Sequence, residues 1–145
     1  MVTKPNTFLT LIKNPFKDMH ALKEGVEFLK KDTPVAFATE TVYGLGGNGL
    51  SIKAIHNIFL AKNRPLDNPL ILHIDKQEWV FELTHAIKEE VQHLINHFWP
   101  GPLTLVLPKK KHVPYEVTAG SDFVALRMPQ HPLALNLILE CGFPL

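Results

Sequence analysis

Residues 59–74 combine a helix end, a turn with two prolines and an apolar segment, and this order restricts how the neighbouring chain can fold. Pro65 ends a helix because its ring fixes φ and removes the amide hydrogen. Pro69 biases Asn68 towards an extended conformation. The run 70–74 is almost entirely apolar, which is typical of a central strand covered on both faces. The sequence therefore predicts a helix–turn–strand unit whose strand is buried.

Two cations, Lys62 and Arg64, lie two residues apart at the end of that helix. A turn restricted by prolines that holds two cations suits an anion such as a phosphate or a carboxylate. The common alternative is a solvated turn with a helix-ending Lys–Arg pair. His73 interrupts the apolar run, and such a residue is more often a hydrogen-bonded core histidine than a ligand. Its nearness to the cationic turn keeps both interpretations open.

The bulk composition predicts one soluble globular domain. The chain has 145 residues, of which 46% are hydrophobic and 20% charged, and its net charge is +1. This charge gives no overall attraction to nucleic acid or membrane. A single cysteine, Cys141, excludes an internal disulfide framework and a multi-cysteine zinc site, so a reducing cytoplasm is the default. We find no signal peptide at the N-terminus and no apolar run long enough to span a membrane.

Apolar spacing and capping residues predict the regular elements. Four helices are predicted: the first begins after Asp18 and buries Leu22, Val26 and Leu29, and the second begins after Ser51 and buries Ile52, Ile55 and Phe59. The third spans 84–98, and the fourth begins after His131, buries Leu133, Leu137 and Ile138, and ends at Gly142. The predicted strands are 8–12, 35–38, 70–74, 103–107 and 123–126, with a stiff turn at 99–102 and irregular chain at 112–122.

Four glycines between residues 44 and 49 exclude a regular element there and permit close backbone approach. Amides in such a turn can contact an anion, but the spacing matches neither a dinucleotide fingerprint nor a Walker A loop. A strand–helix connector is the favoured interpretation. Thr39, Thr41 and Tyr43 alternate just before it, so in an extended segment their hydroxyls would share one face and form a polar pocket wall.

Three further groups of polar residues have open interpretations. Arg127 follows an apolar strand and needs either a carboxylate or phosphate ligand or an internal ion pair. Residues 109–111 are three lysines, which predict a solvated loop and, as the lesser alternative, a surface facing phosphate or RNA. His93 and His97 are four residues apart, but neither a third ligand nor an HExxH pattern accompanies them, so we predict no metal site.

Several of these stretches together match one family. They are Thr-Glu-Thr-Val-Tyr-Gly-Leu-Gly at 39–46, Ala-Lys-Asn-Arg-Pro at 61–65, Asn-Pro-Leu-Ile-Leu-His at 68–73, Phe-Trp-Pro-Gly-Pro-Leu-Thr at 98–104, and Ala-Leu-Arg-Met-Pro at 125–129 with His-Pro at 131–132. In this order the chain resembles the YrdC-like threonylcarbamoyl-AMP synthases, which begin the threonylcarbamoyl modification of transfer RNA. The resemblance covers roughly residues 20 to 145.

The resemblance implies an α/β (α+β) fold: a twisted mixed β-sheet with helices on its faces around a deep, partly basic cavity. It implies that ATP, L-threonine and bicarbonate bind there. The threonine amine becomes a carbamate, whose oxygen attacks the α-phosphorus of ATP and releases pyrophosphate. This is a nucleotidyl transfer, with Mg²⁺ accompanying ATP. The implied partners are transfer RNA and the proteins that transfer the threonylcarbamoyl group, with no membrane.

Carried over position by position, the resemblance implies L-threonine contacts at Thr41, His73 and Arg127. It implies ATP contacts at Lys62, Arg64, Asn68 and Phe123, the last through its backbone, and catalytic roles for Lys62 and Arg64. Nucleotidyl transfer depends on positioning and on neutralising charge at the transferred group, which Lys62 and Arg64 can supply. Arg127 offers a planar fork for the amino-acid carboxylate.

In the family a Ser-Ala-Asn motif lining the same cavity follows shortly after the position of Leu145. We therefore expect residues 1–145 to be a single domain that is incomplete at its C-terminus. Two alternatives remain: a non-catalytic tRNA- or RNA-binding module, and the YrdC-like domain of a hydrogenase-maturation carbamoyltransferase. The near-zero net charge argues against the first alternative. The single cysteine and the start at Met1 argue against the second.

Overall fold

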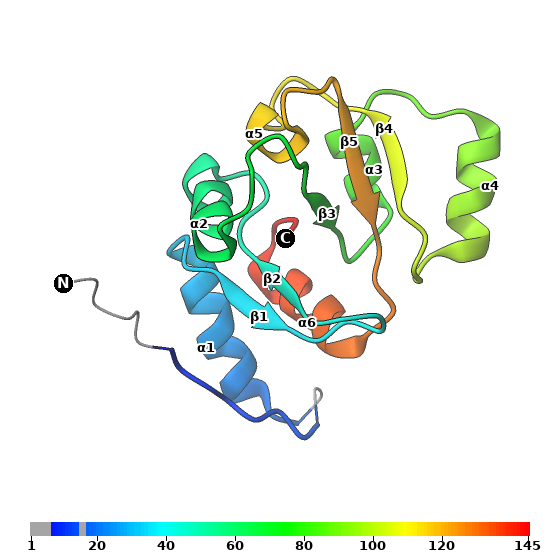
Figure 1. The fold of residues 1–145 in the computed structure, drawn as a ribbon. Helices are drawn as coiled ribbons and strands as arrows, with labels where there is room; N and C mark the ends of the chain where they lie inside the picture. Colours follow the sequence, from blue (N-terminus) through cyan, green and yellow to red (C-terminus); the bar gives the residue numbers. More distant parts are fainter. Residues whose placement is uncertain (1–6, 15–16) are drawn as a thin grey trace.

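The computed structural model describes residues 7–14 and 17–145. Within these residues lie six helices and five strands (Figure 1). The helices are α1 Met19–Lys30, α2 Ile52–Lys62, α3 Glu78–Leu83, α4 Glu89–Phe98, α5 Tyr115–Thr118 and α6 Pro132–Cys141. The strands are β1 Val35–Phe37, β2 Gly44–Gly46, β3 Ile71–His73, β4 Leu105–Pro108 and β5 Phe123–Arg127. The predicted α/β class is confirmed, with the strands divided between two sheets.

The first sheet is the antiparallel pair β1–β2, in which Val35 lies opposite Gly46 and Phe37 opposite Gly44. The prediction that the glycines exclude a regular element is wrong for these residues. A Cβ on Gly46 would lie 2.6 Å from Cε1 of Phe37, so the strand can pair there because the residue has no side chain. Gly46 therefore makes room for the Phe37 ring across the sheet.

The second sheet has β5 at its centre, parallel to β3 and antiparallel to β4. The prediction of a central strand at 70–74 is wrong, since β3 is an edge strand of this sheet and Ile71 is 41% exposed. On the other side of β3, the backbone of His73 exchanges two hydrogen bonds with Leu145, at 2.6 and 3.0 Å. The parallel register places His73 directly beside Arg127.

Two apolar clusters hold these layers together. One joins α1 and α6 beneath the β1–β2 pair, and it contains the predicted core residues Leu22, Val26, Leu29, Leu137 and Ile138. The other joins the second sheet to α2, α3 and α4, and it contains Ile55 and Phe59. The predictions for Ile52 and Leu133 are not met, because Ile52 is 49% exposed in the first turn of α2 and Leu133 is only partly buried.

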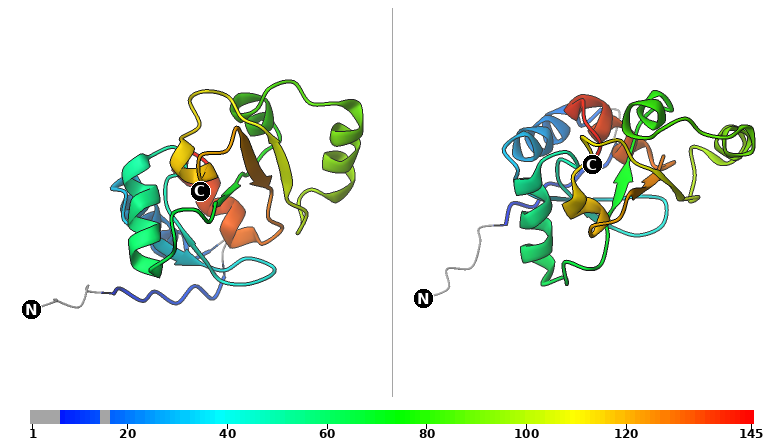
Figure 2. Two further views of the ribbon diagram at one scale, coloured as in Figure 1. Left: turned by 45° about the horizontal axis from the view of Figure 1, so that its top comes forward. Right: turned by 90° about the horizontal axis from the view of Figure 1, so that it is seen from above.

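The predicted helix 84–98 is wrong in its first part. Thr84 forms a bridge with Lys109, and its Oγ1 donates to the carbonyl of Val80. The chain therefore forms the separate helices α3, which was not predicted, and α4. Figure 2 shows α4 at the periphery of the molecule. Its outer position agrees with Leu94 and Phe98, which are 40% and 48% exposed.

The predicted solvated lysine loop is wrong for Lys109. This residue is 6% exposed, and its Nζ donates to the carbonyl of Val113 at 2.8 Å and lies 3.6 Å from the centre of the Tyr115 ring. The neighbouring Lys110 also makes a contact, because its Nζ donates to the carbonyl of Phe81. The local reason is α5, a short helix inside the segment predicted as irregular, which brings Tyr115 under the lysine. These contacts leave fewer cations free for RNA.

The element ends were partly predictable. Ser51 caps α2 by accepting from the amide of Ala54, and Gly142 ends α6 at φ 74°, as expected. Asp18 precedes α1 as predicted, but its carboxylate accepts from the amides of Lys13 and Asn14 instead of from the helix. No strand forms at 8–12. Among the described residues, no helix combines the length and apolar character needed to cross a membrane.

Candidate functional site

A cavity of ≈ 310 Å³ lies where the β1–β2 pair, α2, β3 and the end of β5 meet. Sequence reasoning proposed seven site residues, and five of them line this cavity: Thr41, Lys62, Arg64, His73 and Arg127. Asn68 and Phe123 are not part of its lining. None of the lining side chains is acidic, although three are basic. The cavity wall is therefore suited to an anionic ligand.

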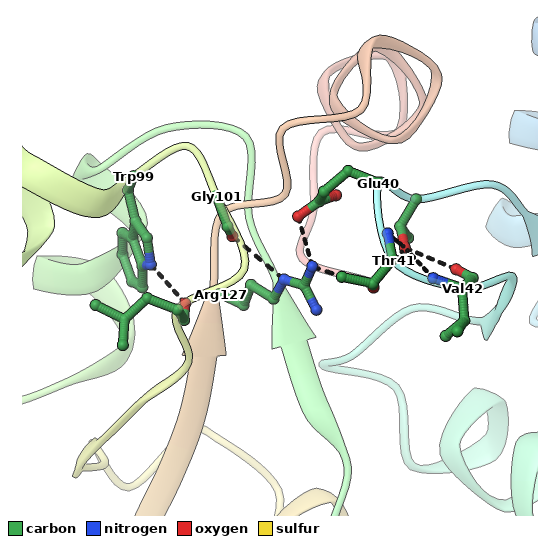
Figure 3. A network of polar contacts seen from close by, with 8 residues as sticks. Glu40, Thr41, Val42, Trp99, Gly101 and Arg127 are labelled. Atoms are coloured by element: carbon green, nitrogen blue, oxygen red, sulfur yellow. Dashed lines mark hydrogen bonds and ion pairs between the residues drawn. The ribbon is translucent and has the colours of Figure 1, made fainter.

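Arg127 contacts residues from two other parts of the chain at the site (Figure 3). Its Nη2 donates to Oε1 of Glu40 at 2.5 Å and to Oγ1 of Thr41 at 3.3 Å, and its Nε donates to the carbonyl of Gly101 at 3.3 Å. The internal ion pair considered from the sequence is therefore present. Nη1 of Arg127 makes no hydrogen bond to the described residues, so one arm of the fork remains available for a ligand.

Glu40 was missed by sequence reasoning. Its side chain is 19% exposed, and its Oε2 is buried without a hydrogen-bond partner among the described residues. Burial raises the pKa of Glu40, but the hydrogen bond and positive charge of Arg127, together with the backbone amides of Glu40 and Gln130, outweigh burial and hold the pKa below its usual range. Glu40 is therefore an anion at neutral pH. Its position between Thr39 and Thr41 was visible, but a partner 87 residues away was not.

The hydroxyl-bearing segment 39–43 forms one wall of the cavity, and Thr39, Thr41 and Tyr43 all line it as expected. Val42 lines it too, so the alternation expected of an extended segment is not present. The segment bends, because Oγ1 of Thr39 donates to the carbonyl of Val42 at 2.7 Å. The same Oγ1 accepts from the amides of Thr41 and Val42, at 3.2 and 3.3 Å. Thr39 thus folds the bend that carries Thr41 towards Arg127.

His73 lines the cavity next to Arg127 and is also hydrogen-bonded, so both features considered from the sequence occur together. Its Nδ1 lies 3.3 Å from the carbonyl of Ile71, and this contact requires the hydrogen on Nδ1. Burial lowers the pKa of His73 and the charge of Arg127 lowers it further, against the opposing effects of Ile71 and Glu40. The ring is therefore neutral at pH 7, with Nε2 as an acceptor.

Arg64 is occupied by its own turn. Its Nε donates to the carbonyl of Asn68 at 3.1 Å, and its Nη2 donates to Oδ1 of Asn68 at 2.6 Å and to the carbonyl of Pro69 at 2.8 Å. The turn starts at Asn63, which ends α2 in the left-handed region at φ 48°. Asn68 thus reaches the site only through Arg64. Lys62 is exposed and has no ion pair or hydrogen bond among the described residues.

Phe123 lies at the start of β5, at the opposite end of the strand from Arg127, and is 50% exposed. In this arrangement the backbone of Phe123 therefore does not face the cavity residues at the Arg127 end of the strand. The described residues also contain no group of three or more His, Cys, Asp or Glu side chains that could hold a metal ion. A divalent cation at this site would need ligands from a bound phosphate.

Comparisons with known proteins point in one direction. The protein-family model Sua5_yciO_yrdC, described as "Telomere recombination", matches residues 27–145. The threonylcarbamoyl-AMP synthase of Pyrococcus abyssi is 55% identical over 111 residues, which are 77% of this chain and 33% of that protein. The threonylcarbamoyl-AMP synthase of Bacillus subtilis is 47% identical over 125 residues, which are 86% and 36% of the two chains.

Solved structures of the same family have a similar fold. The crystal structure of P. abyssi Sua5 complexed with L-threonine superposes with a TM-score of 0.86 at 49% identity, over 88% of this chain and 37% of that one. The crystal structure of Escherichia coli YciO has a TM-score of 0.77 at 20% identity, over 88% and 62% of the two chains, and supports the fold alone. The chain spans about a third of the length of the curated relatives with the highest identities quoted above.

Proposed function

Because the chain belongs to the Sua5–YciO–YrdC family, we propose that it forms the substrate-binding domain of a threonylcarbamoyl-AMP synthase. The reaction would join L-threonine, bicarbonate and ATP into threonylcarbamoyl-AMP and release pyrophosphate. The observation that carries this proposal is the convergence on one cavity of five residues from distant segments: Thr41, Lys62, Arg64, His73 and Arg127. A solvated turn or a core histidine would not require that convergence.

L-Threonine would bind at the Arg127 end of the cavity. The free Nη1 of Arg127 can donate to the amino-acid carboxylate. Nε2 of neutral His73 can accept a hydrogen bond, and the hydroxyl of Thr41 can donate or accept one. A site built from such groups selects a hydroxylated substrate, because an analogue without the hydroxyl would leave polar groups unpaired. A similar protein, P. abyssi Sua5, has been crystallised with L-threonine, which supports L-threonine as a ligand of this fold.

ATP would bind at the Lys62–Arg64 end. In the nucleotidyl transfer, a carbamate oxygen forms a bond to the α-phosphorus while the bond from that phosphorus to the departing pyrophosphate breaks. Negative charge grows on the leaving group, and fixed cations stabilise it without reorganisation. Within the described part of the chain, Lys62 has no other partner, and Arg64 keeps Nη1 free while its turn holds the other nitrogens. Asn68 would act by holding Arg64.

The remaining expectations concern Mg²⁺ and partners. Because the described carboxylates form no metal cluster, Mg²⁺ would accompany the ATP phosphates. The product would pass to the proteins that transfer the threonylcarbamoyl group to transfer RNA. The RNA-binding alternative is weakened by the burial of Lys109 and the contact of Lys110 with Phe81.

Calorimetric titration tests the proposal. We expect L-threonine to bind the 145-residue chain, and L-2-aminobutyrate, which lacks the hydroxyl, to bind at least about tenfold more weakly. With L-threonine, bicarbonate, Mg²⁺ and ATP, a pyrophosphate assay should show release that depends on L-threonine. Lys62→Ala should reduce it, whereas the matched surface variant Lys111→Ala should not. Absence of L-threonine binding to the unaltered chain would overturn the proposal.

A further inference from the structure

We propose that Glu40 is a positioning residue: it orients Arg127, and with it Thr41, for the carboxylate of the amino-acid substrate. The inference rests on the proposed function, because it assumes that Arg127 receives that carboxylate. Glu40 itself is not part of the cavity lining, whereas Arg127 and Thr41 are. Glu40 therefore acts on a substrate through its neighbours and not by contact.

The strength of the three Arg127 contacts supports this role. The contacts to Gly101 and Thr41 are both 3.3 Å long, near the limit of a hydrogen bond, whereas the contact to Glu40 is 2.5 Å and joins opposite charges. Without Glu40, the guanidinium would be held only by two weak contacts. An arginine side chain has several rotatable bonds, so the free Nη1 would then lose its fixed direction.

The connection between elements supports it as well. Glu40 belongs to the bend between β1 and β2, and Arg127 ends β5 in the other sheet. The pair therefore links the two sheets at the cavity (Figure 3). Thr41, next in sequence to Glu40, contacts the same Nη2. One carboxylate thus sets the relative position of two predicted L-threonine contacts.

The burial of Glu40 argues against a purely solvent-exposed ion pair. The side chains of Arg127 and Glu40 are 11% and 19% exposed, and Oε2 of Glu40 is buried without a hydrogen bond from any described residue. A buried carboxylate without full hydrogen bonding lowers the stability of the fold, and such a residue is retained where it serves another purpose. Orientation of a substrate-binding arginine is such a purpose.

Glu40 can also act on the substrate carboxylate through charge repulsion, which would have the opposite effect on L-threonine binding. Glu40 carries a negative charge close to the place where a carboxylate would bind, and like charges repel. If repulsion dominated, removal of Glu40 would strengthen L-threonine binding. If orientation dominates, as we propose, removal weakens it.

The experiment compares Glu40→Ala, Glu40→Gln and the control Glu82→Ala, which removes an exposed carboxylate from α3. We expect Glu40→Ala to raise the Kd for L-threonine about tenfold, the factor of a hydrogen bond to a charged group. Glu40→Gln, which keeps an acceptor oxygen in place, should restore part of the affinity. The Kd for ATP should stay unchanged in all three variants, since a collapsed cavity would weaken both ligands.

A second readout does not depend on substrate. In the ligand-free protein, the ¹H–¹⁵N resonance of Arg127 Nε should be a single sharp signal, and Glu40→Ala should broaden or shift it while Glu82→Ala leaves it unchanged. Unchanged or tighter L-threonine binding by Glu40→Ala, or an unaltered Arg127 resonance, would overturn the inference. Failure of the unaltered chain to bind L-threonine would instead overturn the proposed function, whatever the resonance shows.

Discussion

The two ends of the cavity are held in different ways. At one end, Arg127 is fixed by three groups from two distant segments, residues 40–41 and Gly101, and is largely buried. At the other end, Arg64 is fixed by carbonyl and amide oxygens only four and five residues away, and Lys62 is exposed and has no partner in residues 7–14 and 17–145. The Arg127 end thus depends on the assembled fold, whereas the Lys62–Arg64 end depends on one turn.

This difference has a physical reason. A carboxylate group of a small amino acid offers few contacts, so each must be set in advance by the protein. A triphosphate carries several charges, so a single turn with two cations can bind it without contacts from distant segments. If this interpretation is right, substitutions at the two ends should differ in their effect on stability as well as on binding.

The largest effect should come from Arg127→Gln. It removes the partner of Glu40 and leaves a largely buried carboxylate without a compensating charge, so we expect the free energy of unfolding to fall by about 3 kcal/mol. Urea denaturation measures it. The double variant Glu40→Gln/Arg127→Gln should recover part of the loss, because no unpaired charge remains. A loss in the double variant equal to the sum of both single losses would contradict the pairing.

Arg64→Ala should have a smaller effect on stability. It removes three hydrogen bonds, all within one partly exposed turn, and we expect a loss of about 1 kcal/mol. Arg64→Lys keeps the charge but not the planar fork, so it should be nearly as destabilising as Arg64→Ala. Full rescue by lysine in urea denaturation would show that charge, and not the fork, organises the turn.

Acidification should reduce stability in two pH windows. The pKa of His73 is lowered in the folded protein, so the unfolded chain binds its proton more readily, and stability falls as pH drops below 6.5. The pKa of Glu40 is also lowered, which gives a second loss as pH drops below 4.5. One proton changes the slope by at most about 1.4 kcal/mol per pH unit. His73→Gln should remove the first window and keep the second, as measured by urea denaturation at each pH.

Lys62→Ala should have the smallest effect on folding. Its side chain is exposed and unpaired, so the free energy of unfolding should change by no more than about 0.5 kcal/mol. ATP affinity should nevertheless fall, while Lys111→Ala, another exposed lysine, should alter neither quantity. Equal ATP affinity for Lys62→Ala and the unaltered chain would show that the exposed cation takes no part in binding.

The sequence predicted the features that depend on neighbouring residues. Ser51 and Gly142 marked helix ends because capping is local, and the hydroxyl residues Thr39, Thr41 and Tyr43 indicated a cavity wall, although the segment is bent and not extended. It predicted poorly what depends on distant contacts. Thr84 leaves the helical pattern because its backbone pairs with Lys109, 25 residues along the chain.

In the candidate site, too, the identity of residues was predictable from the sequence, whereas their contacts with distant residues were not. The resemblance gave Arg127 and His73, but it did not give their adjacency, which comes from the parallel register of β3 and β5. Glu40 was overlooked because a lone glutamate in a turn carries no signal of its own. Phe123 was placed among the ATP contacts, yet it lies at the far end of β5 from the cavity residue Arg127, and that role stays a prediction.

The central claim is that the cavity binds two substrates at two separate ends. A ¹H–¹⁵N titration of the labelled chain, first with L-threonine and then with ATP, tests it most directly. We predict that L-threonine shifts the backbone resonances of 39–41, His73 and Arg127, and that ATP then shifts those of 62–69. If both ligands shift the same residues, or if the shifts fall outside the cavity, the two-ended site is wrong.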